Sequence, residues 1–252
     1  MIIDQYIDNQ IGIKLLEQNK KEKENHKSSG KLSAGMLGKP LQWQILKMIL
    51  TDSKEFDEYT LRKFLRGKQI EEWLLTQIPN VVDKQKFVEY KNCIGYVDAL
   101  VDTKDYNYNL GIIPHEIKSV ANAKFKRIID EGKADRSHKL QAGLYALALE
   151  KKHFAIDYIA ADDLRIKTFV YETAEVKQEI DEIIDTFYKT LKAGGVPIFT
   201  PIEKWQSNLK YSDYPNWQEL TQDEINEKLK NKDFQLKPKI EDKIINKKTI
   251  II

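Results

Sequence analysis

The chain has 252 residues, of which 41% are hydrophobic and 32% are charged, and its formal net charge is +2. This near-neutral charge excludes a protein that is held on nucleic acid by overall charge alone, so such a function would need a local site. The single cysteine, Cys93, excludes a disulfide framework and a cysteine-ligated zinc or iron–sulfur site within one chain.

The apolar segments are short. No apolar run reaches the roughly 18–20 residues of a membrane helix, and the first ten residues contain acids where a secretory signal carries basic residues. We therefore expect a soluble cytoplasmic protein that has no membrane partner. The many Lys, Ile and Asn residues suggest an AT-rich genome, which fits a bacterial or phage-infected host cell.

The chain begins with predicted helices. An amphipathic helix is predicted over residues 2–27 from the spacing of Ile3, Ile7, Ile11 and Leu15. The charged and Ser-Gly residues at 20–30 are interpreted as a linker, although a solvated helix end fits part of them equally well. Two further helices are predicted over 41–50 and 60–78.

The middle of the chain alternates between strands and helices. A strand is predicted over 81–90, and a hairpin of strands over 94–102 and 111–120. Pro114 cannot donate to a ladder, so we expect a bulge or an unpaired edge there. The segment at 121–137 is basic and loop-like, with a short helix as the alternative. After it, a helix, two strands and a helix are predicted over 138–150, 154–160, 167–172 and 174–193. This order indicates a mixed α/β domain with a central sheet flanked by helices.

Two carboxylates of the predicted hairpin are candidates for a site. Asp98 lies in an otherwise apolar strand, where a charge is costly unless it is paired or binds a metal. Glu116 and Lys118 are two residues apart, so they share one face of the second strand, and the hairpin can bring Glu116 beside Asp98. Adjacent carboxylates suit Mg²⁺ or Mn²⁺. Taken alone, Asp98 also fits a salt bridge at a strand end, and Glu-x-Lys also fits a surface ion pair.

The helix after the hairpin adds two polar residues. Gln141 and Tyr145 are four residues apart, so they lie on one face of the helix. Apolar residues at core spacing would hold this helix against the sheet, with the two polar side chains near Glu116. A partly exposed glutamine and a tyrosine packed in the core would explain the same pattern.

The order and spacing of these motifs resemble a known family. Gly-x-x-Asp, Glu-x-Lys and Gln-x-x-x-Tyr resemble the RecB-type and lambda-exonuclease-like branch of the PD-(D/E)XK nuclease superfamily, over roughly residues 33–205. The resemblance implies a restriction-endonuclease-like core. The chain then divides into an N-terminal helix and linker at 1–30, a nuclease core at 31–205 and a C-terminal extension at 206–252.

The resemblance also implies a ligand set. Asp98, Glu116 and the backbone carbonyl of Ile117 would bind Mg²⁺ or Mn²⁺. Glu71 matches the Gly-x-x-x-Glu form of an upstream helix in this branch and would be a further metal ligand, although a lysine partner is the competing interpretation. The catalytic residues would be Asp98, Glu116, Lys118, Gln141 and Tyr145.

The chain also departs from the family pattern. Val97 stands where the superfamily name has proline. Leu209 and Ser212 occupy a stretch that carries cysteines in iron–sulfur members of this branch, so we expect no iron–sulfur cluster.

The implied function is a metal-dependent DNA nuclease. The motif with Gln141 and Tyr145 favours an exonuclease in recombination, repair or phage DNA processing, with DNA and either a second copy or a recombination protein as partners. A binding module without turnover and a restriction-type endonuclease are the alternatives. DNA contacts are predicted from the segment after the second hairpin strand, which a solvated charged loop explains equally well; they are Lys124, Lys126, Arg127 and Arg136.

Overall fold

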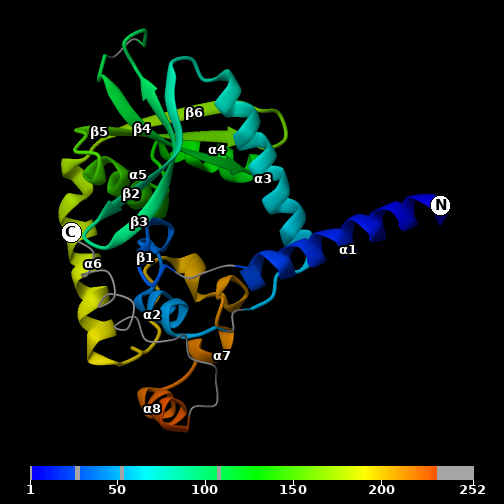
Figure 1. Cartoon of the computed structure of the whole chain (residues 1–252), viewed down its shortest axis with the longest axis vertical. Helices are drawn as coiled ribbons and strands as arrows, with labels where there is room; N and C mark the ends of the chain where they lie inside the picture. Colours follow the sequence, from blue (N-terminus) through cyan, green and yellow to red (C-terminus); the bar gives the residue numbers. More distant parts are fainter. Residues whose placement is uncertain (1, 26–28, 52–53, 107–108, 232–252) are drawn as a thin grey trace, which may run out of the picture.

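The computed structural model describes residues 2–25, 29–51, 54–106 and 109–231 (Figure 1). A six-stranded sheet forms its centre, with strand order β1-β3-β4-β5-β6 and β2 paired with β3. The strands are β1 (Leu32–Ser33), β2 (Val81–Tyr90), β3 (Cys93–Asp102), β4 (Ile112–Val120), β5 (His153–Ala160) and β6 (Ile166–Glu172).

Helices surround the sheet. They are α1 (Ile2–Asn25), α2 (Leu41–Ile49), α3 (Glu58–Gln77), α4 (Asn122–Glu131), α5 (Arg136–Ala148), α6 (Ala174–Ala193), α7 (Pro215–Gln218) and α8 (Gln222–Asn231). Short 3₁₀ turns are η1 (Ala34–Met36), η2 (Lys204–Ser207) and η3 (Leu209–Tyr211). None of the helices described is long and apolar enough to cross a membrane.

The sheet is mixed. Strand β4 pairs antiparallel with β3 and parallel with β5, and β5 pairs antiparallel with β6. The predicted fold class, a central mixed sheet flanked by helices, is therefore confirmed.

Strand β3 is where the sheet forks. Strand β2 runs along one edge of β3, so β1 and β4 must share the other edge. On that shared edge, β1 pairs only with Cys93 and Ile94, and β4 pairs only with Ala99–Asp102. Residues 95–98 therefore face a gap between two diverging strands, and this gap contains the candidate site.

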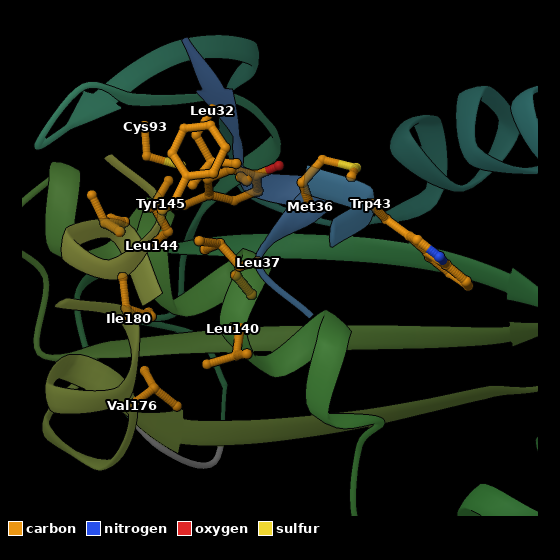
Figure 2. Close-up of a cluster of buried hydrophobic side chains, with 14 of the residues drawn as sticks. Leu32, Met36, Leu37, Trp43, Cys93, Leu140, Leu144, Tyr145, Val176 and Ile180 are labelled. Carbon is orange, nitrogen blue, oxygen red and sulfur yellow. The ribbon is translucent and has the colours of Figure 1, made fainter. Parts of the chain in front are cut away.

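Two apolar clusters cover the two faces of the sheet. The larger joins the sheet to α2, α5 and α6, and its fully buried members include Leu37, Leu144 and Ile180 (Figure 2). The smaller one packs α3 against the sheet through Leu74, Leu75, Ala99, Val101, Ile117 and Ile159. Burial of a side chain of this size stabilises a fold by roughly 1.5–3 kcal/mol, so both layers are held firmly around the fork.

Two local features make the expectations more definite. The segment expected to be loop-like, with a short helix as the alternative, contains the helix α4, because Phe125 and Ile128 are buried three residues apart and Gly132 ends the helix in a left-handed conformation. Pro114 causes no bulge, since it stays in register with Leu100. The expected unpaired edge is found instead on its other side, because the pairing of β4 with β5 begins one residue later at His115.

The two ends of the described chain differ. Helix α1 projects away from the body and crosses α3 near its own middle (Figure 1). Near the other end, Tyr214, Trp217 and Ile225 are buried in the larger cluster. The boundaries at residues 30 and 205 stay predictions, and the tail from residue 232 lies outside the described residues.

Candidate active site

Asp98 lies at the fork. Its Oδ2 atom accepts a 2.7 Å hydrogen bond from the main-chain N–H of Ile117 on β4. The backbone of β3 has diverged from β4 at this point, so the Ile117 N–H has no backbone partner on β3. The Asp98 side chain accepts its hydrogen bond instead. This bond explains how an acidic residue is accommodated within an apolar strand.

Glu116 is fully buried next to the fork. Its exposed fraction is 0%, and its carboxylate forms a close ion pair with the ammonium group of Lys118. Among the described residues, neither carboxylate oxygen of Glu116 accepts a hydrogen bond of normal geometry. The contact agrees with their spacing of two residues, which puts Glu116 and Lys118 on one face of the strand.

Glu71 reaches the same region from α3. The side-chain amide of Gln85 on β2 donates to Glu71 at 3.0 Å and to Asp98 at 3.5 Å, so it bridges the two carboxylates. Gln85 has a positive φ of 50°, which marks a local distortion of β2 opposite Asp98. Glu72, the next residue along α3, is exposed. Phe64, two turns before Glu71 on the same helix, is exposed and packs on Phe56.

Gln141 and Tyr145 line the other side of the fork from α5. The amide of Gln141 donates to the Tyr145 hydroxyl at 2.8 Å. The Tyr145 ring is buried against Gly95 of β3, and Figure 2 shows it among the residues of the larger apolar cluster. The carbonyl oxygen of Gln141 lies near Gly35 of η1. The helix therefore presents one packed tyrosine and one polar amide to the site.

Crowding and burial shift the titration of these groups. Burial above all, together with the neighbouring Asp98, raises the pKa of Glu116 to about 8 against the opposing effect of Lys118. Burial, followed by the charge of Asp98, raises the pKa of Glu71 to about 7. Burial also raises the pKa of Asp98. Burial alone would lower the pKa of Lys118, but Glu116 and Asp98 hold it above its ordinary value.

The donor set fits a hard divalent cation. The carboxylates repel one another, and the two buried oxygens of Glu116 have no hydrogen-bond donor. A bound cation would reduce the repulsion and give these oxygens a partner. In the described part of the chain, no three His, Cys, Asp or Glu side chains converge as a complete metal site. The arrangement therefore offers two adjacent carboxylates, Asp98 and Glu116, with Glu71 held further back by Gln85.

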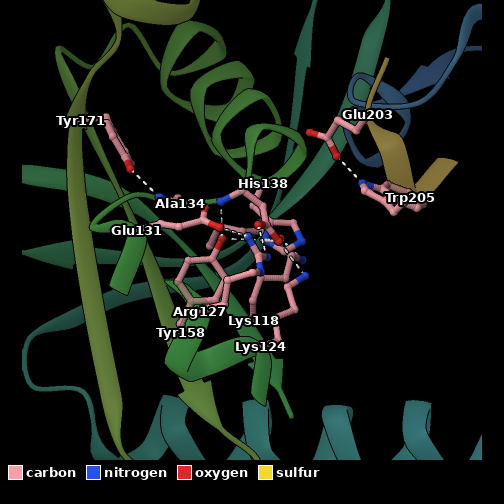
Figure 3. A network of polar contacts seen from close by, with 12 residues as sticks. Lys118, Lys124, Arg127, Glu131, Ala134, His138, Tyr158, Tyr171, Glu203 and Trp205 are labelled. Carbon is pink, nitrogen blue, oxygen red and sulfur yellow. Dashed lines mark hydrogen bonds and ion pairs between the residues drawn. The ribbon is translucent and has the colours of Figure 1, made fainter. Parts of the chain in front are cut away.

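The basic segment after β4 is largely paired. Lys124 and Arg127 both contact Asp135, at 2.6 Å and 2.7 Å, and Arg136 donates to Glu179 at 2.7 Å. Lys126 is exposed and has no ion pair within the described residues. Figure 3 shows Lys124, Arg127 and Glu131 of this network, with Lys118 and Lys124 close to His138.

Three residues near the site were not predicted. Lys39 is half-buried, stacks on the Trp205 ring at 4.6 Å, and has a pKa lowered by burial. His138 is held by the Tyr158 hydroxyl at 2.8 Å, and burial together with Lys118 and Lys124 lowers its pKa. Gln85 is the third. Only the position of His138, one helical turn before Gln141, gave a signal in the sequence.

His115 belongs to the opposite face of the sheet. Its Nδ1 atom lies 2.7 Å from Asp157 on β5, and the Thr168 hydroxyl donates to the same carboxylate at 2.6 Å. Both His115 and Asp157 are buried. This polar network ties β4, β5 and β6 together behind the site, and His115 does not face Glu116.

Comparison with known proteins gives a likeness of fold. No protein-family model and no curated protein matches the sequence. The crystal structure of an alkaline exonuclease from Laribacter hongkongensis has a TM-score of 0.50 at 16% identity, covering 66% of this chain and 89% of that chain. The crystal structure of SSO0001 has a TM-score of 0.49 at 17% identity, covering 85% of this chain and 98% of that chain. The fold of this chain is therefore similar to that of an exonuclease.

Proposed function

We propose that the chain is a metal-dependent nuclease that hydrolyses phosphodiester bonds in DNA. One observation supports the proposal above the others: a fully buried glutamate, Glu116, lies beside Asp98 at a fork in the sheet and contacts Lys118. A buried cluster of like charges is costly to a fold, and perturbed carboxylates of this kind gather at functional sites.

In this proposal Asp98, Glu116 and the Ile117 carbonyl hold Mg²⁺ or Mn²⁺, and Glu71 is a further ligand. When bound, such a cation lowers the pKa of a water molecule and polarises a phosphate. Asp98 keeps its hydrogen bond from the Ile117 N–H, which fixes the carboxylate in place. Gln85 keeps Glu71 within reach of Asp98.

The remaining groups act on the substrate. The Lys118 ammonium contacts the buried carboxylate of Glu116 and is itself partly exposed, so in this proposal it orients the attacking water and stabilises charge on the phosphate oxygens. Gln141 holds a flanking phosphate or the same water through its amide. Tyr145 braces Gln141 through the 2.8 Å hydrogen bond.

Flanking phosphates are held by the basic groups beside the site. Lys39, Lys118 and Lys124 all lie close enough to lower the pKa of His138, so positive charge gathers on one side of the fork. Lys126 is free to contact DNA, whereas Arg127 and Arg136 are already paired with acids. Phosphate contacts of this kind position a duplex or strand without reading its sequence.

We further propose exonuclease action, in recombination, repair or phage DNA processing. The pair of Gln141 and Tyr145 supports it, and the fold shared with an alkaline exonuclease adds an analogy at the level of fold. A restriction-type enzyme would need a further element that reads bases, and the part of the chain that the structure describes contains no separate recognition domain.

The test is cleavage of linear and circular DNA, single- and double-stranded, with Mg²⁺ or Mn²⁺. The wild type is compared with Glu116→Gln and Lys118→Ala. The control is Glu175→Gln, which removes a carboxylate of similar size from the surface ion pair with Lys139. We expect the wild type and the control to degrade linear DNA, and the two site variants to lose at least about 100-fold in rate, the order expected for one acid–base or electrostatic group.

Other outcomes lead to other conclusions. Cutting of closed circles would indicate an endonuclease. A folded wild type that binds DNA without cutting it would indicate a binding module on the same fold. Cutting that survives both site substitutions would place the active site elsewhere in the chain.

A further inference from the structure

The segment that runs through η2 and η3 carries two exposed aromatic rings. Trp205 is 37% exposed and Tyr211 is 50% exposed, and their ring centroids lie 5.6 Å apart with the planes at 87°. Neither ring belongs to the larger apolar cluster of the fold. We call Trp205 and Tyr211 the aromatic corner. Large apolar groups that gather on one exposed surface mark an interaction site more often than single ones do.

The fold holds the aromatic corner from behind. The Trp205 ring packs in an edge arrangement on the buried ring of Trp43, with centroids 6.4 Å apart, and its indole N–H donates to the Glu203 carboxylate (Figure 3). The next side chain, the fully buried amide of Gln206, donates to the Gly38 carbonyl at 2.9 Å. A ring that is already held in place loses little conformational freedom when a ligand packs on it.

The loop before α2 joins the aromatic corner to the active site. The Nζ atom of Lys39 stands 4.6 Å from the centroid of the Trp205 ring. Gly38, the residue before it, lies so close to Ser137 of α5 that a β-carbon there would stand 2.4 Å from the serine β-carbon. Ser137 is about one helical turn before Gln141. One lysine side chain therefore separates the aromatic corner from the helix that carries the polar groups of the site.

Lysines stand around both rings. The Nζ atom of Lys210 lies 4.9 Å from the centroid of Tyr211, in the same way that Lys39 stands over Trp205. Lys204, the residue before Trp205, is exposed. Proteins that bind single-stranded nucleic acid combine these two features, because aromatic rings stack on the bases and cationic groups follow the phosphates.

Positive charge continues from the aromatic corner to the fork. Burial above all lowers the pKa of Lys39; the carboxylate of Asp213 opposes this, and the charge of nearby Lys124 lowers the pKa further. Lys124 and the active-site residue Lys118 both lie close to His138 (Figure 3). A strand that leaves the active site on this side would therefore meet lysines until it reaches the two rings.

We propose that the aromatic corner binds a single-stranded segment of the DNA substrate, with bases stacked on Trp205 and Tyr211 and with Lys39 and Lys210 on the phosphates. Tyr211 is the main stacking surface, because it is the more exposed ring. The inference rests on the proposed nuclease function and adds a substrate class to it, namely DNA with a single strand beside the scissile phosphate. A duplex keeps its bases stacked on one another, so it offers the rings no free base except at its ends.

The experiment compares two single strands of equal length, an oligothymidylate and a stable abasic strand that has the same phosphates but no bases. Fluorescence anisotropy without a metal measures the affinity for each. We expect the wild type to bind the oligothymidylate at least about fivefold more tightly, which is the lower end of the effect of one base–aromatic stack. Tyr211→Leu and Trp205→Leu should each reduce this ratio, and the double variant should bring it close to one.

Two further variants act as controls. Phe87 of β2 matches Tyr211, since it is 51% exposed and packs edge-on against one aromatic ring, that of Tyr96, at 5.4 Å. Phe87→Leu should leave the ratio unchanged. Lys39→Ala should weaken binding of both strands by a similar factor, because it removes a phosphate contact and no base contact. Urea denaturation shows whether each variant is folded.

Equal affinity of the wild type for the two strands would overturn the proposal. So would an unchanged ratio in the folded double variant, or a ratio that Phe87→Leu lowers as much as Tyr211→Leu does. The cleavage assay with Mg²⁺ or Mn²⁺ tests the nuclease function separately. A protein that cleaves DNA but binds both strands equally would keep that function and lose this site, whereas binding that depends on bases without any cleavage would keep the site and refute the nuclease.

Discussion

Gly95 and Tyr145 are in such close contact that a β-carbon at position 95 would stand 2.5 Å from the ring atom Cε1 of Tyr145. The ring can approach because Gly95 has no side chain, and the contact falls in the stretch between Ile94 and Ala99 where β3 has no neighbouring strand on one edge. The hydroxyl of the same tyrosine accepts the hydrogen bond from Gln141. The absent side chain of a glycine therefore sets where α5 presents its polar groups to the fork.

Gly95→Ala should destabilise the protein and reduce its activity. The ring of Tyr145 must move to admit the new methyl group, and overpacking of a buried contact costs typically about 1–3 kcal/mol. Urea denaturation measures the free energy of unfolding. Gly67→Ala is the matched control, because a β-carbon at that position of α3 meets no atom within 4 Å. It should raise stability by roughly 0.5–1 kcal/mol, as alanine replaces glycine inside a helix. A Gly95→Ala protein as stable as the wild type would contradict this account of the contact.

The metal-free protein should become less stable as the pH rises from about 5 to about 8. The pKa of Glu116 is raised from 4.5 to about 8 in the folded state, so the folded chain keeps a proton that the unfolded chain has lost. The resulting stabilisation is fully present below pH 4.5, the pKa of the unfolded chain, and is lost as the pH rises through about 8, the pKa of the folded chain. The total change in the free energy of unfolding is on the order of a few kcal/mol. Thermal unfolding in a chelator measures it. Glu116→Gln should flatten the dependence, and an unchanged slope in this variant would assign the effect to other groups.

Added Mg²⁺ or Mn²⁺ should reverse this trend. The cation binds the ionised carboxylates of Asp98 and Glu116, so the rise in melting temperature should be larger near pH 8 than near pH 5. Asp98→Asn should remove most of the rise, since its amide can still accept the Ile117 N–H but carries no charge. Equal stabilisation by metal in the wild type and in this variant would place the cation outside the fork.

The parts of the site that local sequence could predict are those that a repeating pattern creates. The period of two in a strand places Glu116 and Lys118 together, and the period of a helix places Gln141 beside Tyr145. The apolar character of β3 made Asp98 conspicuous. In each case the relevant neighbours are a few residues apart or one hairpin apart, so spacing alone carries the information.

Other parts depend on contacts that spacing does not encode. Gln85 reaches Glu71 only because β2 is distorted at its positive φ, and Lys39 reaches the site because η1 packs under α5. The sequence predicts α4 only as a short helix that a loop could contain, since its many charges conceal the two buried residues, Phe125 and Ile128. The fork itself arises because the two-residue strand β1 pairs with β3. Strand β1 is too short to leave a pattern in the sequence.

The polar network behind the site should be structural. Asp157→Ala would leave the His115 ring buried without its 2.7 Å partner, and an unsatisfied buried group costs roughly 1–3 kcal/mol. Thr168→Val, which removes only the hydroxyl donor to Asp157, should cost less. Denaturant unfolding compares the two variants. Metal affinity should be unchanged in both, and a loss of metal binding without a loss of stability would show that this face of the sheet takes part in the site.

The basic residues beside the fork should differ in their contribution to DNA binding. Lys39→Ala and Lys126→Ala should each weaken binding of linear DNA and reduce the slope of affinity against salt by about one, because each removes one phosphate contact. Arg127→Ala should change both quantities less, since the guanidinium is already held by Glu131 at 3.1 Å and Asp135 at 2.7 Å. Fluorescence anisotropy in the absence of a metal measures affinity without cleavage. If Arg127→Ala has the largest effect, the ion pairs around Asp135 must open when DNA binds. If none of the three has an effect, the DNA path must leave the fork on the side of Glu71 and Gln85.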